Sequence, residues 1–312
     1  MTILLDDDDL DRLPAMEIAL AAMEEAFLER DQGQLVSPPR FQVPFDTLGN
    51  LVFTVGGNLG SNPLAGFRVY NTFHGQVDSQ LTAVWSAGDG ELQGIVVGSR
   101  LGQIRTGAIG GVAIRHMSPP SAKVMGIIGS GPQARMQLEA AASVRALEHV
   151  CVFSRSEQSR KTFADEMSRA LSLRVEATDN AHAAVDGADI IVCATSSPTP
   201  VIDARWLKRG VHINSLGPKT VDQHELGVDV AEMADVIAAD SREQASAYRA
   251  PFFLSGSSSE GRLVELAAII SGGITVRRTG DETTLFCSVG LAGTEVLLAS
   301  RLLAAARECP CD

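Results

Sequence analysis

The chain has 312 residues, 45% of them hydrophobic, and a formal net charge of −12 at pH 7. This length suits two domains or one large α/β domain. The acidic balance argues against general nucleic-acid binding, because no basic surplus exists to displace the counterions of a phosphate backbone. No run approaches the roughly 20 apolar residues that a membrane helix needs. The first residues, MTILLDDDDLDRL, do not resemble a signal peptide, so we expect a cytoplasmic protein without a membrane partner.

The cysteines agree with a reducing compartment. Cys151, Cys193 and Cys287 lie in apolar, strand-like runs, where a buried thiol behaves as a small hydrophobic group. Cys309 and Cys311 form a CPC tail, and two ligands without partners make a poor zinc site. We therefore expect neither disulfides nor a metal.

The first third of the chain changes from helical to strand-like patterning. Residues 13–31 place apolar groups at helical spacing, and the acidic run Asp6–Asp9 before them is interpreted as a solvated cap. From residue 40 onward the runs RFQVPF, LVFTVGG, GFRVYNTFHG, LTAVWSAGDG and LQGIVVGS predict short strands separated by turns. Residues 100–117 then predict a helix that ends before Pro119 and Pro120, which mark a domain boundary.

After this boundary, strand-like and helix-like runs alternate. The strand-like runs are KVMGIIG, HVCVFS, LRVEAT, ADIIVCAT, GVHINSLG, ADVIAAD and TLFCSVG. Such alternation predicts an α/β fold with a doubly wound parallel sheet, here a Rossmann domain over residues 119–291. Residues 1–118 form the other domain, and the C-terminal helical stretch, 292–312, is expected to fold back onto it.

A glycine-rich turn follows the first of these strands, in VMGIIGSGPQARM. Gly129, Gly131 and Ala134 give the pattern G-x-G-x-x-A. The first glycine allows a tight turn, the second allows close approach of a pyrophosphate, and the small third residue lets the helix pack on the strand. Because the motif lies between a strand and a helix, it predicts a dinucleotide site at the helix N-terminus, built from residues 129–134. This turn includes Ser130, Pro132 and Gln133.

The end of the second strand indicates which dinucleotide is bound. An NAD site usually has an acidic residue there, to bind the ribose hydroxyls. This chain has Ser154, Arg155 and Ser156, and an arginine suits a 2′-phosphate. NADP(H) is therefore favoured, and NAD(H) remains the alternative because Glu157 is close enough in sequence to reach a ribose.

An ordered set of segments resembles the ornithine cyclodeaminase/mu-crystallin family. These are RTGAIGGVAIRH, GSGPQA, VFSRS, ADIIVCATSSPTPVI, WLKRGVHINSLG, HEL, ADSREQA and FCSVGLA. The resemblance implies that the N-terminal α/β domain binds substrate and forms a homodimer through its sheet. It also implies nicotinamide-dependent chemistry at the Cα–N bond of a small amino acid, 2-oxo acid or imine.

The resemblance also assigns residues. Arg40 and Arg105 match two arginines that hold the substrate carboxylate, and two arginines suit a carboxylate because each can form a bidentate pair. Further cofactor contacts are implied where strands end: Ala194, Thr195, Ser196, Ser215, Leu216, Gly217, Ser288, Gly290 and Leu291.

Two positions depart from the family pattern. Arg68 stands where the family usually has a lysine, and arginine is a poor general acid because it stays protonated. Lys219 stands where cyclodeaminases have an aspartate. Our hypothesis is that Lys219 supplies the proton while Arg68 binds substrate, although each residue is alternatively a non-catalytic surface group. His74 is a third candidate, because histidine titrates near neutral pH.

These residues favour an NADP-preferring oxidoreductase that reduces an imine or ketimine of a small 2-oxo acid to an amino acid, or runs the reverse reaction. Two alternatives stay open. One is an ornithine cyclodeaminase that converts ornithine to proline with bound NAD. The other is a non-catalytic, mu-crystallin-like protein that binds NADP.

Overall fold

A computed structural model describes residues 2–74, 79–277 and 279–308. The chain divides into two compact units, one of residues 1–105 with 290–312 and one of residues 106–289. The first division falls inside helix α3 (Arg100–Met117), whereas the sequence placed it after residue 118. The roles that the sequence assigned to the two domains stay predictions.

The first unit is built on a mixed sheet with the strand order β1-β7-β6-β5-β4-β2, and β3 pairs with β4. Among the described strands of this first sheet, only the β1–β7 pair is parallel. The predicted short strands are present, and β1 was missed because it has only three residues. The elements are β1 (Ile3–Leu5), α1 (Asp7–Asp11), α2 (Ala15–Asp31), β2 (Leu35–Val36), β3 (Phe41–Pro44), η1 (Asp46–Leu48), β4 (Asn50–Asn58), β5 (Leu64–Asn71), β6 (Leu81–Ser86), β7 (Leu92–Val97) and α10 (Thr294–Glu308).

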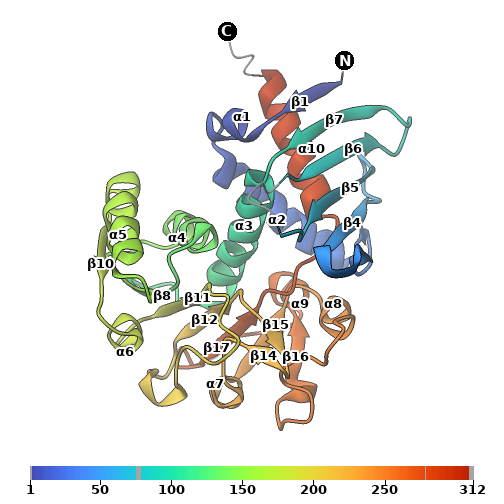
Figure 1. The fold of residues 1–312 in the computed structure, drawn as a ribbon. Coiled ribbons are helices and arrows are strands. Elements are labelled where there is room, and N and C mark those ends of the chain that lie inside the picture. Colours follow the sequence, from blue (N-terminus) through green and yellow to red (C-terminus); the bar gives the residue numbers. More distant parts are fainter. Residues whose placement is uncertain (1, 75–78, 278, 309–312) are drawn as a thin grey trace. The chain divides into compact units, whose positions relative to one another are not determined.

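Helix α10 packs on one face of this sheet and on α2, in red beside the blue and teal strands of Figure 1. Small residues make the close approach possible. A Cβ atom added at Gly66 would lie 3.1 Å from the Val296 side chain, and one added at Gly94 would lie 2.5 Å from Leu303. The predicted return of the C-terminal helix to the first unit is thus seen, over residues 294–308.

The acidic run before α2 has a different role from the one predicted. Asp6 caps α1 by accepting from the Asp9 N–H at 3.0 Å. The Asp7 carboxylate accepts from the N–H groups of Ser99 and Arg100, at 3.1 and 3.0 Å, where α3 begins. The interpretation as a solvated cap for the following helix was wrong, because the run forms its own helix and caps one that is distant in sequence.

The second unit is a doubly wound sheet, as predicted. All eight strands are parallel, in the order β10-β9-β8-β11-β12-β17-β15-β16. The elements are β8 (Val124–Ile128), α4 (Pro132–Val144), β9 (His149–Phe153), α5 (Glu157–Leu171), β10 (Arg174–Ala177), α6 (Ala181–Val185), β11 (Ile190–Cys193), η2 (Ala204–Trp206), β12 (His212–Ser215), β13 (Lys219–Thr220), β14 (Gln223–His224), α7 (Val228–Met233), β15 (Val236–Ala239), α8 (Arg242–Ser246), η3 (Glu260–Arg262), β16 (Leu263–Glu265), α9 (Leu266–Ile270) and β17 (Thr284–Cys287).

Each face of this sheet has its own core. In β11, Ile190 and Val192 belong to one buried cluster, whereas Ile191 and Cys193 belong to the other. Continuous apolar runs are therefore required in the central strands, because both of their faces are covered. The chain winds outward from β8 to β10 and then returns to β11, on the other side of β8. Ligands bind at such a switch point in open α/β sheets, outside the carboxyl ends of the strands.

None of the helices in the described part of the chain is long and apolar enough to span a bilayer.

Candidate active site

The glycine turn has the backbone that its sequence predicts. Gly129 has φ +115°, and a Cβ atom there would collide with the Ala194 carbonyl oxygen. Only glycine is therefore accommodated at this position. Gly131 precedes α4 at its N-cap, and nothing lies within 4 Å of a Cβ atom built on it. Ala134, in the first turn of α4, is fully buried. The space before the α4 N-terminus is thus open, as a bound pyrophosphate would require.

A cavity of about 410 Å³ lies at the carboxyl ends of β8, β9 and β11. It brings together seven of the predicted cofactor residues: Gly129, Gly131, Ser154, Arg155, Ala194, Thr195 and Ser196. Sequence reasoning missed several other lining residues, among them Phe153, Ala181, Ser197 and Val201. Within the predicted turn, Gln133 Oε1 is buried without a hydrogen-bond partner. The open helix terminus fits a dinucleotide bound along the turn.

The end of β9 is organised around Ser154. Its Oγ accepts from Ser130 Oγ at 3.0 Å and donates to the Ser156 carbonyl oxygen at 3.2 Å. Arg160 is buried and donates to the Ser154 carbonyl oxygen, so it supports the turn. Arg155 is exposed at the cavity.

The alternative ribose acceptor has another partner. Glu157 binds Lys161 at 2.6 Å on the surface of α5. Its carboxylate is therefore directed along the helix.

Glu225 is a buried acid that the sequence did not mark as functional. Its Oε2 accepts from the Thr195 N–H and Oγ1, at 3.0 and 2.9 Å. Its Oε1 accepts from Ser215 Oγ at 2.9 Å, from the Leu216 N–H at 2.8 Å and from the Gly217 N–H. One carboxylate thus ties the ends of β11 and β12 together, and all four of these partners are predicted cofactor residues.

Asp240 has the equivalent place on the next pair of strands. It is fully buried after β15 and accepts from the Val289 N–H at 2.7 Å and from Ser288 Oγ at 3.3 Å. An acid directly after a parallel strand was the available signal in the sequence, since such a residue lies at the ligand-binding edge.

Lys219 is buried within electrostatic reach of both acids. Only 4% of the residue is exposed, and its Nζ donates to the Gly217 carbonyl oxygen at 2.6 Å. Burial lowers the pKa of Lys219, while the negative charges of Glu225 and Asp240 raise it, with burial dominant. The alternative of an exposed loop lysine does not fit this burial; a catalytic role stays a prediction.

The cysteine nearest this network is inert. Cys287 is fully buried, and burial raises the pKa of its thiol to about 12. This agrees with the sequence interpretation of an unreactive thiol.

In the first unit, Arg68 and Arg105 share one carboxylate. Glu295 Oε1 accepts from Arg105 Nη2 at 2.6 Å and from Arg68 Nη1 at 3.4 Å. Arg68 Nε also donates to Gln80 Oε1 at 3.0 Å. All three charged side chains are at least 89% buried, with exposed fractions of 11%, 9% and 1% for Arg68, Arg105 and Glu295. Sequence reasoning missed Glu295, which lies in an apolar helical run near the other end of the chain.

One hydrogen-bond donor of Arg105 is unused, because its Nε is buried without a partner. A Cβ atom on Gly102, one turn earlier in α3, would collide with the Arg68 guanidinium, so glycine makes room for that group. The two arginines and Glu295 carry one net positive charge, which suits an anionic group.

Two further predicted residues lie elsewhere in the first unit. Arg40 precedes β3, and its Nη1 would lie 3.6 Å from a Cβ atom on Gly290. This places Arg40 beside the segment of Gly290 and Leu291 that the sequence assigns to the cofactor. His74 is exposed beyond the end of β5.

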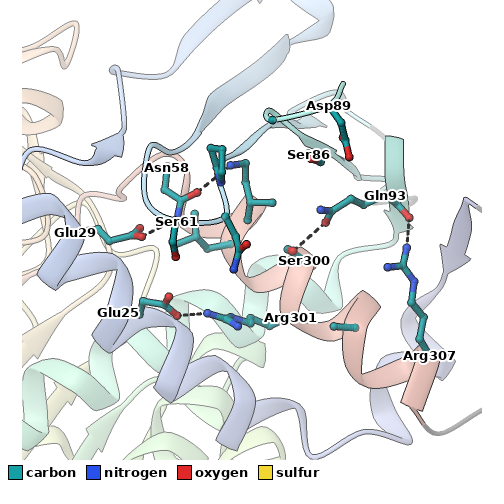
Figure 2. Close-up of a pocket in the computed structure, with 16 residues that line it drawn as sticks. Glu25, Glu29, Asn58, Ser61, Ser86, Asp89, Gln93, Ser300, Arg301 and Arg307 are labelled. Carbon is teal, nitrogen blue, oxygen red and sulfur yellow. Dashed lines mark hydrogen bonds and ion pairs between the residues drawn. The ribbon is translucent and has the colours of Figure 1, made fainter. Parts of the chain in front are cut away.

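The first unit has a cavity of its own, of about 480 Å³, whose lining includes residues of α2 and α10 and of two loops (Figure 2). Its two arginines have partners, and Glu29 Oε1 accepts from Asn58 Nδ2 at 2.6 Å. Arg301 pairs with Glu25 at 2.5 Å, and Arg307 donates to the Gln93 carbonyl oxygen at 2.9 Å. No sequence-predicted site residue lines it, so it is not the candidate active site.

The fold and the strand-end turns define a Rossmann-type α/β protein with a second α/β unit. The chain belongs to the ornithine cyclodeaminase/mu-crystallin family, whose model matches residues 2–307. A Δ(1)-pyrroline-2-carboxylate reductase of Bacillus cereus is 35% identical over 217 residues, a match that spans 68% of this chain and 66% of the relative.

Two solved structures are similar over nearly the whole chain. One is the Thermococcus litoralis Δ(1)-pyrroline-2-carboxylate reductase in complex with NADH and L-proline, with a TM-score of 0.88, 28% identity and coverage of 99% of this chain and 98% of the other. The second is an archaeal alanine dehydrogenase dimer with bound NAD, with a TM-score of 0.88, 26% identity and coverage of 99% and 97%.

Proposed function

We propose that this protein is a nicotinamide-dependent oxidoreductase that reduces the C=N bond of a small ketimine or imine acid to an amino acid, or catalyses the reverse reaction. The glycine turn before α4, with its open helix terminus, is the observation that carries this proposal. The family and the reductase and dehydrogenase named above support it.

The chemistry needs a hydride, a proton and a fixed substrate. A bound nicotinamide supplies or accepts the hydride. Arg105, Arg68 and Arg40 bind the substrate carboxylate, and charge-assisted pairs to guanidinium groups give both affinity and orientation. Orientation matters because hydride transfer asks little of a protein beyond placement and electrostatics.

Lys219 is the proposed proton donor to the developing amine. Arg68 is unsuited to this role because its guanidinium does not release a proton at neutral pH. Burial lowers the pKa of Lys219, which makes its ammonium a better acid. His74 is the less favoured candidate, since it is exposed in the loop after β5.

NADP(H) is the proposed cofactor, in preference to NAD(H). Ser154, Arg155 and Ser156 follow β9 without an acid among them, and Arg155 is exposed at the cavity. A guanidinium there suits a 2′-phosphate. The two solved relatives described above hold NADH and NAD, so the cofactor must be measured directly for this chain.

The test is oxidation of NADPH and NADH in parallel by the purified protein. Suitable substrates are cyclic ketimine acids such as Δ(1)-pyrroline-2-carboxylate, and mixtures of pyruvate, glyoxylate or oxaloacetate with an amine. Stoichiometric consumption of NADPH is the expected result. Ammonia release from ornithine with only catalytic NAD would instead identify a cyclodeaminase. Tight NADPH binding without turnover of any substrate would favour a binding protein.

We also propose that the first unit forms a homodimer through the sheet face opposite α10. Strand register places apolar residues in one continuous row across it: Phe41, Phe53, Val69, Leu81 and Val97. Phe41 is 52% exposed and Val97 is 38% exposed. An exposed apolar surface of this kind marks an association site, and the archaeal relative is described as a dimer. A cytoplasmic location remains part of this proposal.

A further inference from the structure

We propose that Glu225, Lys219 and Asp240 form a buried network that positions the strand-end turns of the cofactor crevice and holds the Lys219 ammonium in place. This inference rests on the proposed function and assigns Glu225 and Asp240 a role as positioning residues.

The geometry of the sheet gives the first argument. Strands β11, β12, β17 and β15 are consecutive neighbours, and their carboxyl ends lie at one edge. Glu225 joins β11 to β12 through Thr195 and Ser215. Asp240, directly after β15, joins that strand to the end of β17 through Ser288. The two acids therefore fix four adjacent strand ends.

Burial gives the second argument. Glu225 and Asp240 are fully buried, and carboxylates without water need charge compensation and hydrogen bonds. Glu225 receives five hydrogen-bond donors from two strand-end turns, those of β11 and β12. Lys219 supplies a compensating positive charge, because its buried Nζ donates to the Gly217 carbonyl oxygen while the N–H of the same glycine donates to Glu225.

Tight packing gives the third argument. A Cβ atom on Gly217 would collide with the Thr195 carbonyl oxygen and would lie 2.5 Å from Glu225 Oε2. The Gly217 N–H donates to Glu225, and its carbonyl oxygen accepts from Lys219 Nζ at 2.6 Å. One peptide segment thus connects the acid to the lysine.

The titratable groups that act electrostatically on the Lys219 ammonium are Glu225, Asp240, Cys287 and Cys193. Both thiols are buried and have raised pKa values, so they stay neutral near pH 7. The two carboxylates therefore determine the electrostatic environment of Lys219. Removing either negative charge lowers the pKa of Lys219.

The experiment uses Glu225→Gln and Asp240→Asn in the full chain, which remove charge at nearly constant shape. Titrations followed by nucleotide fluorescence give the Kd for NADPH and for NADH. We expect Glu225→Gln to raise both Kd values by the same factor, about tenfold or more, because its partners are shared strand-end turns. In turnover assays, the alkaline limb of kcat should move to lower pH in both variants.

Asp189→Asn is the matched control. Asp189 also accepts from two backbone N–H groups, those of Lys123 and Val124. It directly precedes β11, so it lies at the amino-terminal ends of the strands, opposite the cofactor crevice. It should lower the temperature of unfolding without changing the Kd for nucleotide or the pH profile.

A folded Glu225→Gln protein with wild-type Kd values would overturn the positioning role of Glu225, and an unmoved alkaline limb in both variants would overturn the electrostatic coupling to Lys219. If Glu225→Gln does not fold, the Kd values and the pH profile of Asp240→Asn apply the same test to the ends of β15 and β17. A wild-type protein that binds nucleotide but turns over no substrate would contradict the proposed function, while the binding titrations would still decide the network.

Discussion

Arg105 and Glu295, 190 residues apart in the chain, form a buried ion pair with 2.6 Å between Nη2 and Oε1. Burial raises the pKa of Glu295, but the charges of Arg105 and Arg68 outweigh this effect and hold it below the ordinary value of 4.5. The carboxylate of α10 is therefore ionised in the folded protein and keeps both guanidinium groups together.

Replacing Glu295 with Gln should destabilise the first unit by about 3 kcal/mol, because it leaves two buried arginines without their counter-charge. The pKa of Glu295 is lower in the folded than in the unfolded state. Its stabilising contribution is thus complete above the unfolded pKa and is lost as pH falls through the folded pKa. Chemical denaturation from pH 7 to pH 3 should show a weaker loss of stability at acid pH in Glu295→Gln than in the wild type. If the free energies of unfolding of the two proteins fell equally with pH, the stabilising ionisation of Glu295 would be contradicted.

The two glycines of the turn before α4 should respond differently to alanine. Gly129→Ala forces φ +115° on a residue with a Cβ atom, and that atom would collide with the Ala194 carbonyl oxygen. We expect a loss of about 1–3 kcal/mol in the free energy of unfolding. Gly131→Ala meets no atom within 4 Å and should fold normally.

Gly131→Ala should nevertheless weaken binding of both NADPH and NADH, because its methyl group would occupy the space proposed for the pyrophosphate. Calorimetric titration with each nucleotide measures this. Wild-type affinity in Gly131→Ala would show that the nucleotide does not approach this turn.

Arg155→Ala should separate the two cofactors. Loss of a charge-assisted bond to a 2′-phosphate predicts an increase in the Kd for NADPH of about tenfold or more, with little change for NADH. Arg169→Ala, which removes an exposed arginine further along α5, is the control. Equal effects of Arg155→Ala on both nucleotides would exclude recognition of the 2′-phosphate by this side chain.

Lys219→Arg should test proton donation apart from charge. Arginine retains the positive charge beside Glu225 and Asp240 but does not release a proton near pH 7. We expect kcat to fall by about 100-fold or more, as for loss of a general acid, while the Kd for NADPH stays close to the wild-type value. Lys219→Met, which removes both the proton and the charge, should lower kcat and also raise the Kd for NADPH. An unchanged kcat in Lys219→Met with a good substrate would exclude Lys219 as the acid.

Val55→Lys should dissociate the proposed homodimer. Val55 is 43% exposed and pairs with Phe67 on the face opposite α10. A buried lysine there would cost more than the apolar contact that it replaces. Sedimentation velocity should show a dimer for the wild type and a monomer for the variant. Val221→Lys, which changes a 39% exposed valine of the second unit, should remain dimeric.

Features that depend on local pattern were predictable from the amino-acid order alone. Alternating apolar runs predicted the parallel sheet of residues 124–287, and the spacing of Gly129 and Gly131 located the turn before α4. The extents of the helices were also predictable where apolar residues recur at helical spacing, as in α2. The local pattern failed for the short strand β1, which was missed, and for the acidic run at Asp6–Asp9, where one carboxylate caps a helix more than 90 residues away.

The functional acids became recognisable only from the packing of the folded chain. Glu225 and Glu295 carry no local signature, and each acquires its role from partners on other elements: Thr195 and Ser215 for Glu225, and Arg68 and Arg105 for Glu295. A hydrogen bond or ion pair between distant residues depends on the packing of sheets and helices, which a single sequence does not encode as spacing. The same packing buries Lys219, so its exposure was decided by the fold, although its acceptor Gly217 is only two residues away in the chain.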